Sequence, residues 1–245
     1  MIERLEAQMR AMQMLMKRQD ITANNLANIN TPGFKGSKVF YKMVQEKING
    51  KKVSKPVPQQ QVDMTQGVLK PTHNPFDFGI KGKGFFAVKN NNGIQLTRDG
   101  RMHINPDGYL VDDKGAKVMG DSGPIFLPQY MKATDQNGRQ AKINVARDGT
   151  IRINNKVYDK LRIVDVKDTS KLERKGSNYF TTDPKFLVDD NKSNVLQGYY
   201  ESGNVSALNE MVDMMKTTKM FQSQQRIIRT TDEMLGRAAS KLSKF

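Results

Sequence analysis

The sequence predicts an α+β protein, with long N- and C-terminal α-helices that pair in a coiled-coil-like bundle and a central, mainly antiparallel β-domain. Apolar residues recur at a step of seven near both ends of the chain, which is typical of helices that pack along a seam. The middle has short apolar runs separated by hairpin turns. The expected segments are an N-terminal helix over 1–33, an extended linker or arm over 34–75, the β-domain over 76–190, a returning connector over 191–203 and a C-terminal helix over 204–245.

The N-terminal segment carries two apolar columns that together form one helical stripe. The first column contains Ile2, Met9, Met16 and Ala23, and the second contains Leu5, Met12 and Leu26, with Gln19 as an interruption. The helix should end between Asn28 and Gly33, because asparagine and glycine favour turns and Pro32 lacks a backbone N–H. The following residues, 34–75, are predicted to be extended. Within them, residues 51–61 are rich in lysine, proline and glutamine and have too few apolar side chains for a core.

The middle of the chain has the turn frequency of an antiparallel meander. Turns are expected at 91–93, 98–100, 105–108, 113–115, 137–138 and 147–149. Strands are expected at 85–88, 141–145, 150–153, 161–166 and 195–200, and a loop is expected at 181–194. In the segment 161–166 the alternation of apolar and polar residues slips by one position after Ile163, which suggests a β-bulge.

The C-terminal segment keeps the step of seven for longer. Its column contains Ala207, Met214, Phe221, Ile228, Leu235 and Leu242, partly flanked by Met211, Thr218 and Ala239. A strict step of seven favours a left-handed supercoil. Asn204 or Ser206 is a candidate N-cap, with Glu210 near the positive end of the helix. The simpler alternative is that both terminal helices belong to an ordinary core. The predicted assembly interface consists of Ile2, Leu5, Met9, Met12, Met16, Leu26, Met211, Met214, Phe221, Ile228, Leu235 and Leu242.

Composition restricts the function. The 245 residues are sufficient for a real core, and the absence of cysteine excludes disulfides, thiolate metal sites and cysteine nucleophiles. No apolar run approaches the roughly 18 residues of a membrane span, and Glu3, Arg4 and Glu6 occupy positions where a signal peptide would be apolar. The net charge of +15 leaves a basic nucleic-acid-binding protein as the alternative function. The positive charge is spread along the chain, which weakens that alternative.

The residues offer little for catalysis, so we expect a protein that is not an enzyme and has no catalytic residues, cofactor or metal. The two histidines, His73 and His103, are 30 residues apart and lack nearby carboxylates at a useful spacing. Gly82-Lys83-Gly84 lacks the third glycine and the following helix of a dinucleotide-binding loop, and is better explained as a turn before a strand.

The segment from Asn24 to Lys35 strongly resembles the N-terminal signature of bacterial flagellar axial proteins, the rod and hook family. The matching residues are Asn24, Asn25, Leu26, Ala27, Asn28, Asn30, Thr31, Pro32, Gly33 and Phe34. Further matches are Asn74-Pro75-Phe76-Asp77, Gly82-Lys83-Gly84-Phe85-Phe86, Leu96-Thr97-Arg98-Asp99-Gly100, and Gln197-Gly198-Tyr199 followed by Ser202-Gly203-Asn204-Val205. The segment after Gly120 is more similar to proximal-rod members than to distal-rod members.

The resemblance implies a structural subunit of the flagellar basal-body rod that polymerises through its terminal helices and serves motility. The implied partners are other rod and hook subunits and the flagellar type III export apparatus, with a contact to peptidoglycan as a further candidate. Neither nucleic-acid binding nor membrane insertion is expected. The implied location is the basal body, reached across the inner membrane without a cleaved signal peptide.

Overall fold

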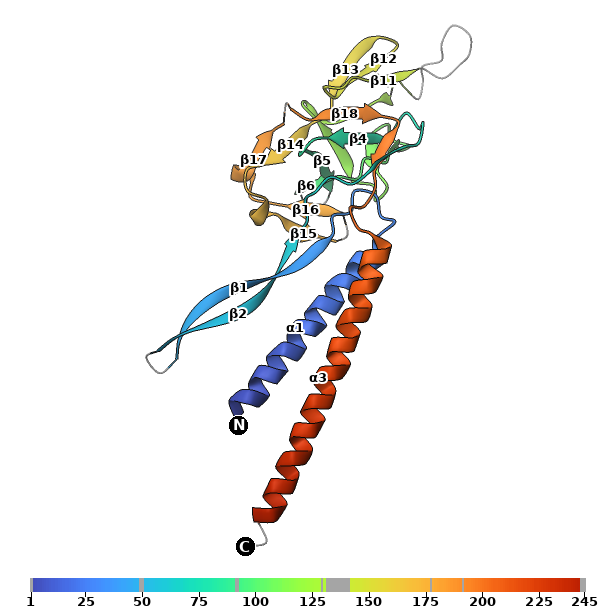
Figure 1. Ribbon diagram of the computed structural model, residues 1–245. Coiled ribbons are helices and arrows are strands. Elements are labelled where there is room, and N and C mark those ends of the chain that lie inside the picture. Colours follow the sequence, from blue (N-terminus) through green and yellow to red (C-terminus); the bar gives the residue numbers. More distant parts are fainter. Residues whose placement is uncertain are drawn as a thin grey trace. The chain divides into compact units, whose positions relative to one another are not determined.

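A computed structural model describes residues 2–48, 51–90, 93–128, 130, 142–176, 178–190 and 192–242 (Figure 1). It has a helix near each end and an antiparallel β-rich middle, as the sequence predicts. The chain divides into two compact units. The helical unit contains residues 1–27, 37–63 and 205–245, and the β unit contains residues 28–36 and 64–204.

The helical unit contains α1 (Ile2–Ala27), α3 (Ala207–Leu242) and the hairpin of β1 (Ser37–Ile48) with β2 (Lys51–Val62). The two helices are in contact, and they lie nearest each other at the end of α1 and the start of α3 (Figure 1). The α1 helix ends at Ala27, directly before the predicted turn region. The threonines of α3 that follow its first turns donate to carbonyl oxygens four residues earlier, as Thr217 does to Asp213 at 2.8 Å. These hydroxyls are therefore satisfied within the helix.

The predicted arm over 34–75 is divided between the two units. Residues 37–48 and 51–62 are extended, as expected, but they pair with one another, with Ser37 opposite Val62 and Tyr41 opposite Pro58. A two-stranded ribbon leaves one edge of each strand unpaired, so proline can lie in β2 without removing a hydrogen bond that the ladder needs. Residues from 64 onward belong to the β unit instead. Pairing of β1 with β2 is the feature that composition alone did not indicate.

The β unit is built from antiparallel pairs. Its largest sheet follows the order β15-β16-β6-β5-β9-β8-β7, with β14 also on β5, β17 on β14 and β10 on β9. Smaller sheets are β11-β12-β13, β18-β4 and β19-β3. The strands are β3 (Leu69–Pro71), β4 (Phe78–Lys81), β5 (Phe85–Asn90), β6 (Gly93–Thr97), β7 (Met102–Ile104), β8 (Leu110–Asp112), β9 (Lys117–Gly120), β10 (Gly123–Pro124), β11 (Ile143–Val145), β12 (Thr150–Ile153), β13 (Lys156–Lys160), β14 (Ile163–Val166), β15 (Glu173–Lys175), β16 (Tyr179–Thr181), β17 (Leu187–Asp189), β18 (Asn194–Gln197) and β19 (Tyr199–Glu201).

One continuous aliphatic and aromatic core joins these sheets. Its fully buried members include Phe78, Phe86, Val118, Ile125 and Ile151. Tryptophan is absent from the chain, so phenylalanine and branched aliphatic residues fill the volume. Contacts among residues far apart in sequence thus hold the unit together, as antiparallel pairing of distant strands requires.

Several sequence expectations differ from the structure in detail. The predicted loop at 181–194 contains a short 3₁₀ helix, η2 (Pro184–Phe186), followed by β17, because Val188 pairs with Asp165 of β14. A second 3₁₀ turn, η1, spans Thr169–Lys171. The slip after Ile163 corresponds to two consecutive buried residues, Ile163 and Val164, and β14 pairs there without an irregular register. The predicted turn at 137–138 lies outside the described residues, as do positions 91 and 92 of the predicted turn at 91–93 and position 141 of the predicted strand at 141–145.

Candidate assembly site and signature segment

The first half of the signature lies at the end of α1, where Asn25 holds the start of β1. The Asn25 side-chain oxygen accepts a hydrogen bond from the Ser37 N–H at 2.9 Å, and its amide nitrogen donates to the Ser37 carbonyl at 2.9 Å. The same nitrogen donates to Glu210 of α3 at 3.2 Å. Burial raises the pKa of Glu210, and the Asn25 hydrogen bond opposes that rise. A single buried amide therefore joins the three elements of the helical unit.

The second half of the signature belongs to the β unit. Thr31 N–H donates to the Asn28 carbonyl at 3.0 Å, and Phe34 N–H donates to the Thr31 carbonyl at 3.2 Å, which makes a compact turn around Pro32 and Gly33. The Gly33 N–H donates to the Glu201 carbonyl at 2.7 Å. The sequence predicted the turn as the end of a helix, and the structure shows that the turn also belongs to the β unit, where it is bonded to Glu201.

Gly33 is required at this turn for two reasons. Its φ of +65° lies in the left-handed region that other residues rarely adopt. A Cβ atom there would also lie 2.2 Å from the backbone nitrogen of Asp99, a distance that no real contact allows. Asp99 belongs to the Leu96-Thr97-Arg98-Asp99-Gly100 match, so two of the sequence motifs meet at this point.

A buried ionic cluster lies beside the turn and joins Lys35, Arg98 and Glu201. Lys35 Nζ is 2.5 Å from one Glu201 carboxylate oxygen, and Arg98 donates to the other at 3.1 Å. The side chains of all three residues are at most 2% exposed. The backbone completes the cluster: Gly67 N–H donates to Glu201 at 2.8 Å, and Lys35 donates to the Thr65 carbonyl at 2.8 Å.

The electrostatics of this cluster follow from burial. Desolvation lowers the pKa of Arg98, and the charge and hydrogen bond of Glu201 oppose that change. Arg98 also donates to the Gly82 carbonyl at 2.7 Å and lies 5.0 Å from the centre of the Phe85 ring. Buried charges of this kind are stable only when they are paired and hydrogen-bonded, as they are here. The cluster therefore holds Lys35, the last residue of the signature, against Glu201 of β19.

Phe34 and Arg174 close the other side of the turn. Phe34 is fully buried, and the Arg174 guanidinium lies 4.7 Å from its ring centre and 5.4 Å from that of Phe180. Arg174 also donates to the Lys35 carbonyl. Nearby, the Asn204 side chain accepts from Gly36 N–H at 2.7 Å and donates to the Thr65 carbonyl at 3.0 Å. Asn204, a predicted helix cap, thus holds this turn, and α3 begins later, at Ala207.

The predicted assembly residues fall into three groups. Half-buried side chains in the single chain are Met12, Leu26, Met214, Phe221, Ile228 and Leu235. Met9, Met16 and Met211 are exposed. The side chains of Ile2, Leu5 and Leu242 lie outside the described residues. In α1 Gln8 and Leu15 are half-buried and Thr22 is buried, and the three recur at a step of seven, so a covered column lies one position before the predicted Met9 and Met16 column.

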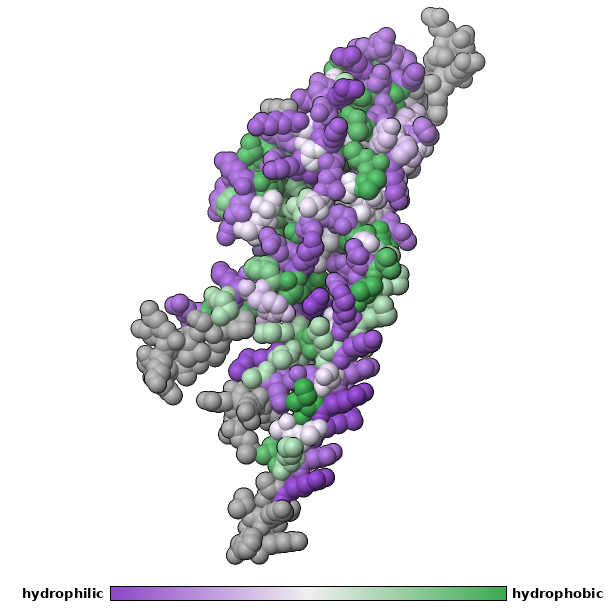
Figure 2. Space-filling view, in the orientation of Figure 1, coloured by the Kyte–Doolittle hydropathy of each residue, from purple (hydrophilic) through white to green (hydrophobic). Residues whose placement is uncertain are grey.

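A further apolar column on α3 is absent from the prediction. Met220, Ile227 and Met234 also recur at a step of seven, and they are 49%, 48% and 67% exposed. Leu208 and Met215 are exposed nearer the start of the helix. Apolar side chains are visible among polar ones along the helical unit (Figure 2). Each of these residues lies one position from a residue of the predicted column, so a search for single columns passes over them.

The described residues do not assemble a catalytic centre from the histidines. His73 lies in a loop with a φ of +59°, and His103 lies in β7, and both are exposed. Within the described ranges, no group of three histidine or acidic side chains could hold a metal ion. Gly82, with a φ of +145°, leads directly toward β5, as a turn before a strand should. No helix in the described part is long and apolar enough to span a membrane.

Three family models match this architecture segment by segment. A model described as flagella basal body rod protein covers residues 5–35, which contain α1 and the signature. A model of the flagellar hook protein FlgE/F/G D1 domain covers residues 79–153, and a model of the flagellar basal body rod FlgEFG protein C-terminal region covers residues 196–241. A flagellar basal-body rod protein FlgF from Caulobacter vibrioides is 30% identical, with 95% of each chain covered. The chain belongs to the flagellar rod-protein family.

Other members of the rod-protein family match over similar lengths. FlgF from Escherichia coli is 31% identical with 93% of each chain covered. FlgG from Buchnera aphidicola of Acyrthosiphon pisum is 29% identical with 88% of this chain and 90% of the relative covered. The chain is thus similar to FlgF rod proteins, and FlgG proteins are similar too. None of these findings supports the nucleic-acid-binding alternative.

Proposed function

We propose that this chain is a non-enzymatic structural subunit of the flagellar basal-body rod, and that it polymerises through its terminal helices to form part of the shaft that serves motility. Its partners are then other rod and hook subunits. Family membership supports the rod assignment. The proposal for the interface rests on one observation: α3 carries apolar columns on two neighbouring sides, one half-buried within the chain and one exposed.

A second copy of this chain, or a related rod subunit, fits the exposed column. Met220, Ile227 and Met234 keep the step of seven that a neighbouring helix needs for continuous contact, including a coiled-coil-like one. Met9 and Met16 of α1 supply a similar exposed pair. Full burial of a large aliphatic side chain contributes roughly 1.5–3 kcal/mol, and these side chains are about half exposed, so each could add about 1 kcal/mol on assembly. Several such contacts per subunit are needed to offset the cost of association.

Further parts of the proposal concern how and where the subunit is placed. We infer export across the inner membrane by the flagellar type III apparatus without a cleaved signal peptide, and a proximal-rod position in the basal body. The similarity to FlgF rod proteins supports the position. A contact between the basic surface and peptidoglycan is the remaining candidate interaction, and the net charge of +15 supports it.

The assembly proposal is tested by placing a charge on the exposed column. Ile227→Asp should fold normally, because Ile227 is exposed in the single chain, but it should fail to restore complete rods and swimming in a strain that lacks the gene. Ser223→Asp is the matched control, since Ser223 is exposed on the same helix and the added charge is identical. The measurement is electron microscopy of purified basal bodies together with motility.

A second variant tests the half-buried column. Leu235→Asp should leave the β unit folded and abolish incorporation. Normal rods with Ile227→Asp would show that the exposed column is not an interface. Normal swimming after deletion of the gene would contradict the rod assignment itself.

A further inference from the structure

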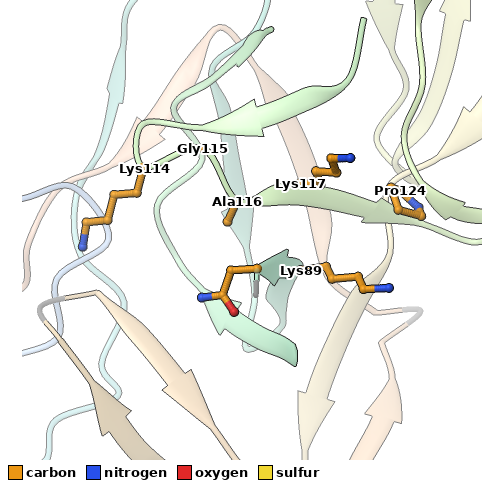
Figure 3. Close-up of a pocket in the computed structure, with 7 residues that line it drawn as sticks. Lys89, Lys114, Gly115, Ala116, Lys117 and Pro124 are labelled. Atoms are coloured by element: carbon orange, nitrogen blue, oxygen red, sulfur yellow. The ribbon is translucent and has the colours of Figure 1, made fainter. Parts of the chain in front are cut away.

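The β unit contains a pocket whose lining is strongly cationic. Its volume is about 470 Å³, and three of its lining side chains are lysines: Lys89, Lys114 and Lys117. Its other lining residues are Asn90, Gly115, Ala116 and Pro124, so no carboxylate is found among the described residues that line it. The lysines come from the end of β5 and from the turn and strand around β9. Three lysines therefore border one depression, and the Lys114 side chain is directed away from Lys89 and Lys117 (Figure 3).

Two of these lysines face each other across a strand pair. Lys89 of β5 is the cross-strand partner of Lys117 of β9. Like charges directly opposite on adjacent strands destabilise a sheet. The side chains of Lys89 and Lys117 extend in a similar direction from their strands, with Lys114 on the other side of the pocket (Figure 3). An anion bound between the ammonium groups of Lys89 and Lys117 would offset the repulsion that destabilises this strand pair in the free protein.

The nearest carboxylates are engaged elsewhere. Asp112 precedes the turn, but one of its oxygens accepts from the N–H groups of Lys114 and Ala116, and the other accepts from the Tyr179 hydroxyl at 2.6 Å. Asp113 pairs with Arg101 at 2.6 Å. Among the described residues, the three lysine ammonium groups have no carboxylate within ion-pair distance.

Aromatic rings hold two of the ammonium groups in place. Lys117 Nζ lies 3.8 Å from the centre of the Tyr109 ring, and Lys114 Nζ lies 4.6 Å from that of Tyr179. Lys114 also donates to the side-chain oxygen of Asn178 at 2.9 Å. A ring face positions an ammonium group without using its N–H donors, so these lysines are oriented and still have donors for a ligand. Pre-ordered donors lower the cost of binding.

We propose that this pocket binds a multivalent oxyanion, a ligand with at least two carboxylate or phosphate groups. Lys89 and Lys117 are direct cross-strand partners, which favours a ligand that can reach both ammonium groups over a monovalent ion. Lysine is a compact point charge and does not require the planar geometry that arginine does, so both carboxylates and phosphates satisfy the site. The rod assignment does not depend on this site.

The test uses the full-length protein, with citrate and pyrophosphate as probes and isothermal titration calorimetry as the measurement. Both probes should bind saturably, and acetate at equal ionic strength should not. Lys89→Gln or Lys117→Gln should weaken the binding roughly fivefold or more, because each removes a charged hydrogen-bond donor. Both variants should also keep or raise the melting temperature, because each removes a like-charge pair.

Lys156→Gln is the control, since Lys156 is exposed on β13, outside the pocket, and the variant has the same net charge. Binding of one probe alone supports the site and identifies the oxyanion group that it takes. Equal weakening by Lys156→Gln would overturn the proposal, because the effect would then be one of net charge. Failure of both citrate and pyrophosphate to bind saturably would overturn it as well.

Discussion

The buried carboxylate of Glu201 gives the sharpest test of how the signature is held. Glu201→Gln keeps the volume of the side chain and removes its charge, which leaves Lys35 and Arg98 as buried cations without a counter-charge. Breaking a buried ion pair by removing one partner costs about 3–5 kcal/mol. Domains are stable by roughly 5–15 kcal/mol, so this single change should remove about a fifth or more of the stability of the β unit.

The expected shift in melting temperature follows from the size of the β unit. For domains of this size, 1 kcal/mol corresponds to about 2–4 °C, so the melting temperature should fall by about 6–20 °C. Differential scanning calorimetry is the appropriate assay, because the chain lacks tryptophan for fluorescence. Glu173→Gln is the matched control, since its side chain is 75% exposed and its contact with Lys175 is long, at 3.9 Å.

Glu173→Gln should change the melting temperature by no more than about 2 °C, as an exposed pair contributes little. A Glu201→Gln protein within about 1 kcal/mol of the unmodified one would refute the reasoning. Such a result would mean that water reaches the cluster, or that Lys35 is neutral in the variant. In either case the cluster of Lys35, Arg98 and Glu201 would not be what stabilises the signature.

Three further predictions concern single residues. Gly33→Ala should lower the free energy of unfolding by more than about 1 kcal/mol, and by clearly more than Gly115→Ala does. Both glycines have positive φ, but only a Cβ at Gly33 would collide with backbone atoms. Equal losses for the two variants in urea unfolding would contradict this. Burial raises the pKa of Asp99 to about 6 from 3.8, so the folded state binds that proton more tightly and the free energy of unfolding should fall by roughly 2 kcal/mol as the pH rises from about 4 to 6. Asp99→Asn should remove that part of the pH dependence, and an unchanged difference between the two proteins across this range would oppose the assignment. Asn25→Ala should lower stability by about 1–3 kcal/mol and speed amide exchange at Ser37, and unaltered exchange there would show that the amide does not hold the strand.

Local periodicity was sufficient to predict the two helices and the antiparallel middle. The column from Ala207 to Leu235 lies on the half-buried side of α3, because a step of seven follows one side of a helix. The pairing of β1 with β2 was not predicted, since residues 51–61 lack the apolar alternation that marks most strands. The strand at 187–189 was also missed, because it is short and follows a proline turn.

The candidate site was predicted only in part. The signature residues Pro32 and Gly33 indicated a turn, and the turn is present. Lys35 and Arg98 lie in segments that resemble the family, but their contact with Glu201 was not predicted, because they are 166 and 103 residues from it and no local pattern connects them. Sequence alone gives no reason to expect these three charged side chains to be buried until the fold brings them together. The assembly interface remains a prediction.

The division of the chain into two units has a mechanical consequence. The backbone passes between the helical unit and the β unit at 27/28, 36/37, 63/64 and 204/205, so four covalent connections join them. The segments at three of these passages are anchored by Asn25, by Gly33 with Glu201, and by Asn204. In a subunit of a rotating shaft, a twisting load on one unit would be shared among four parallel tethers. Each tether would carry a fraction of the strain, and no single backbone bond would carry all of it.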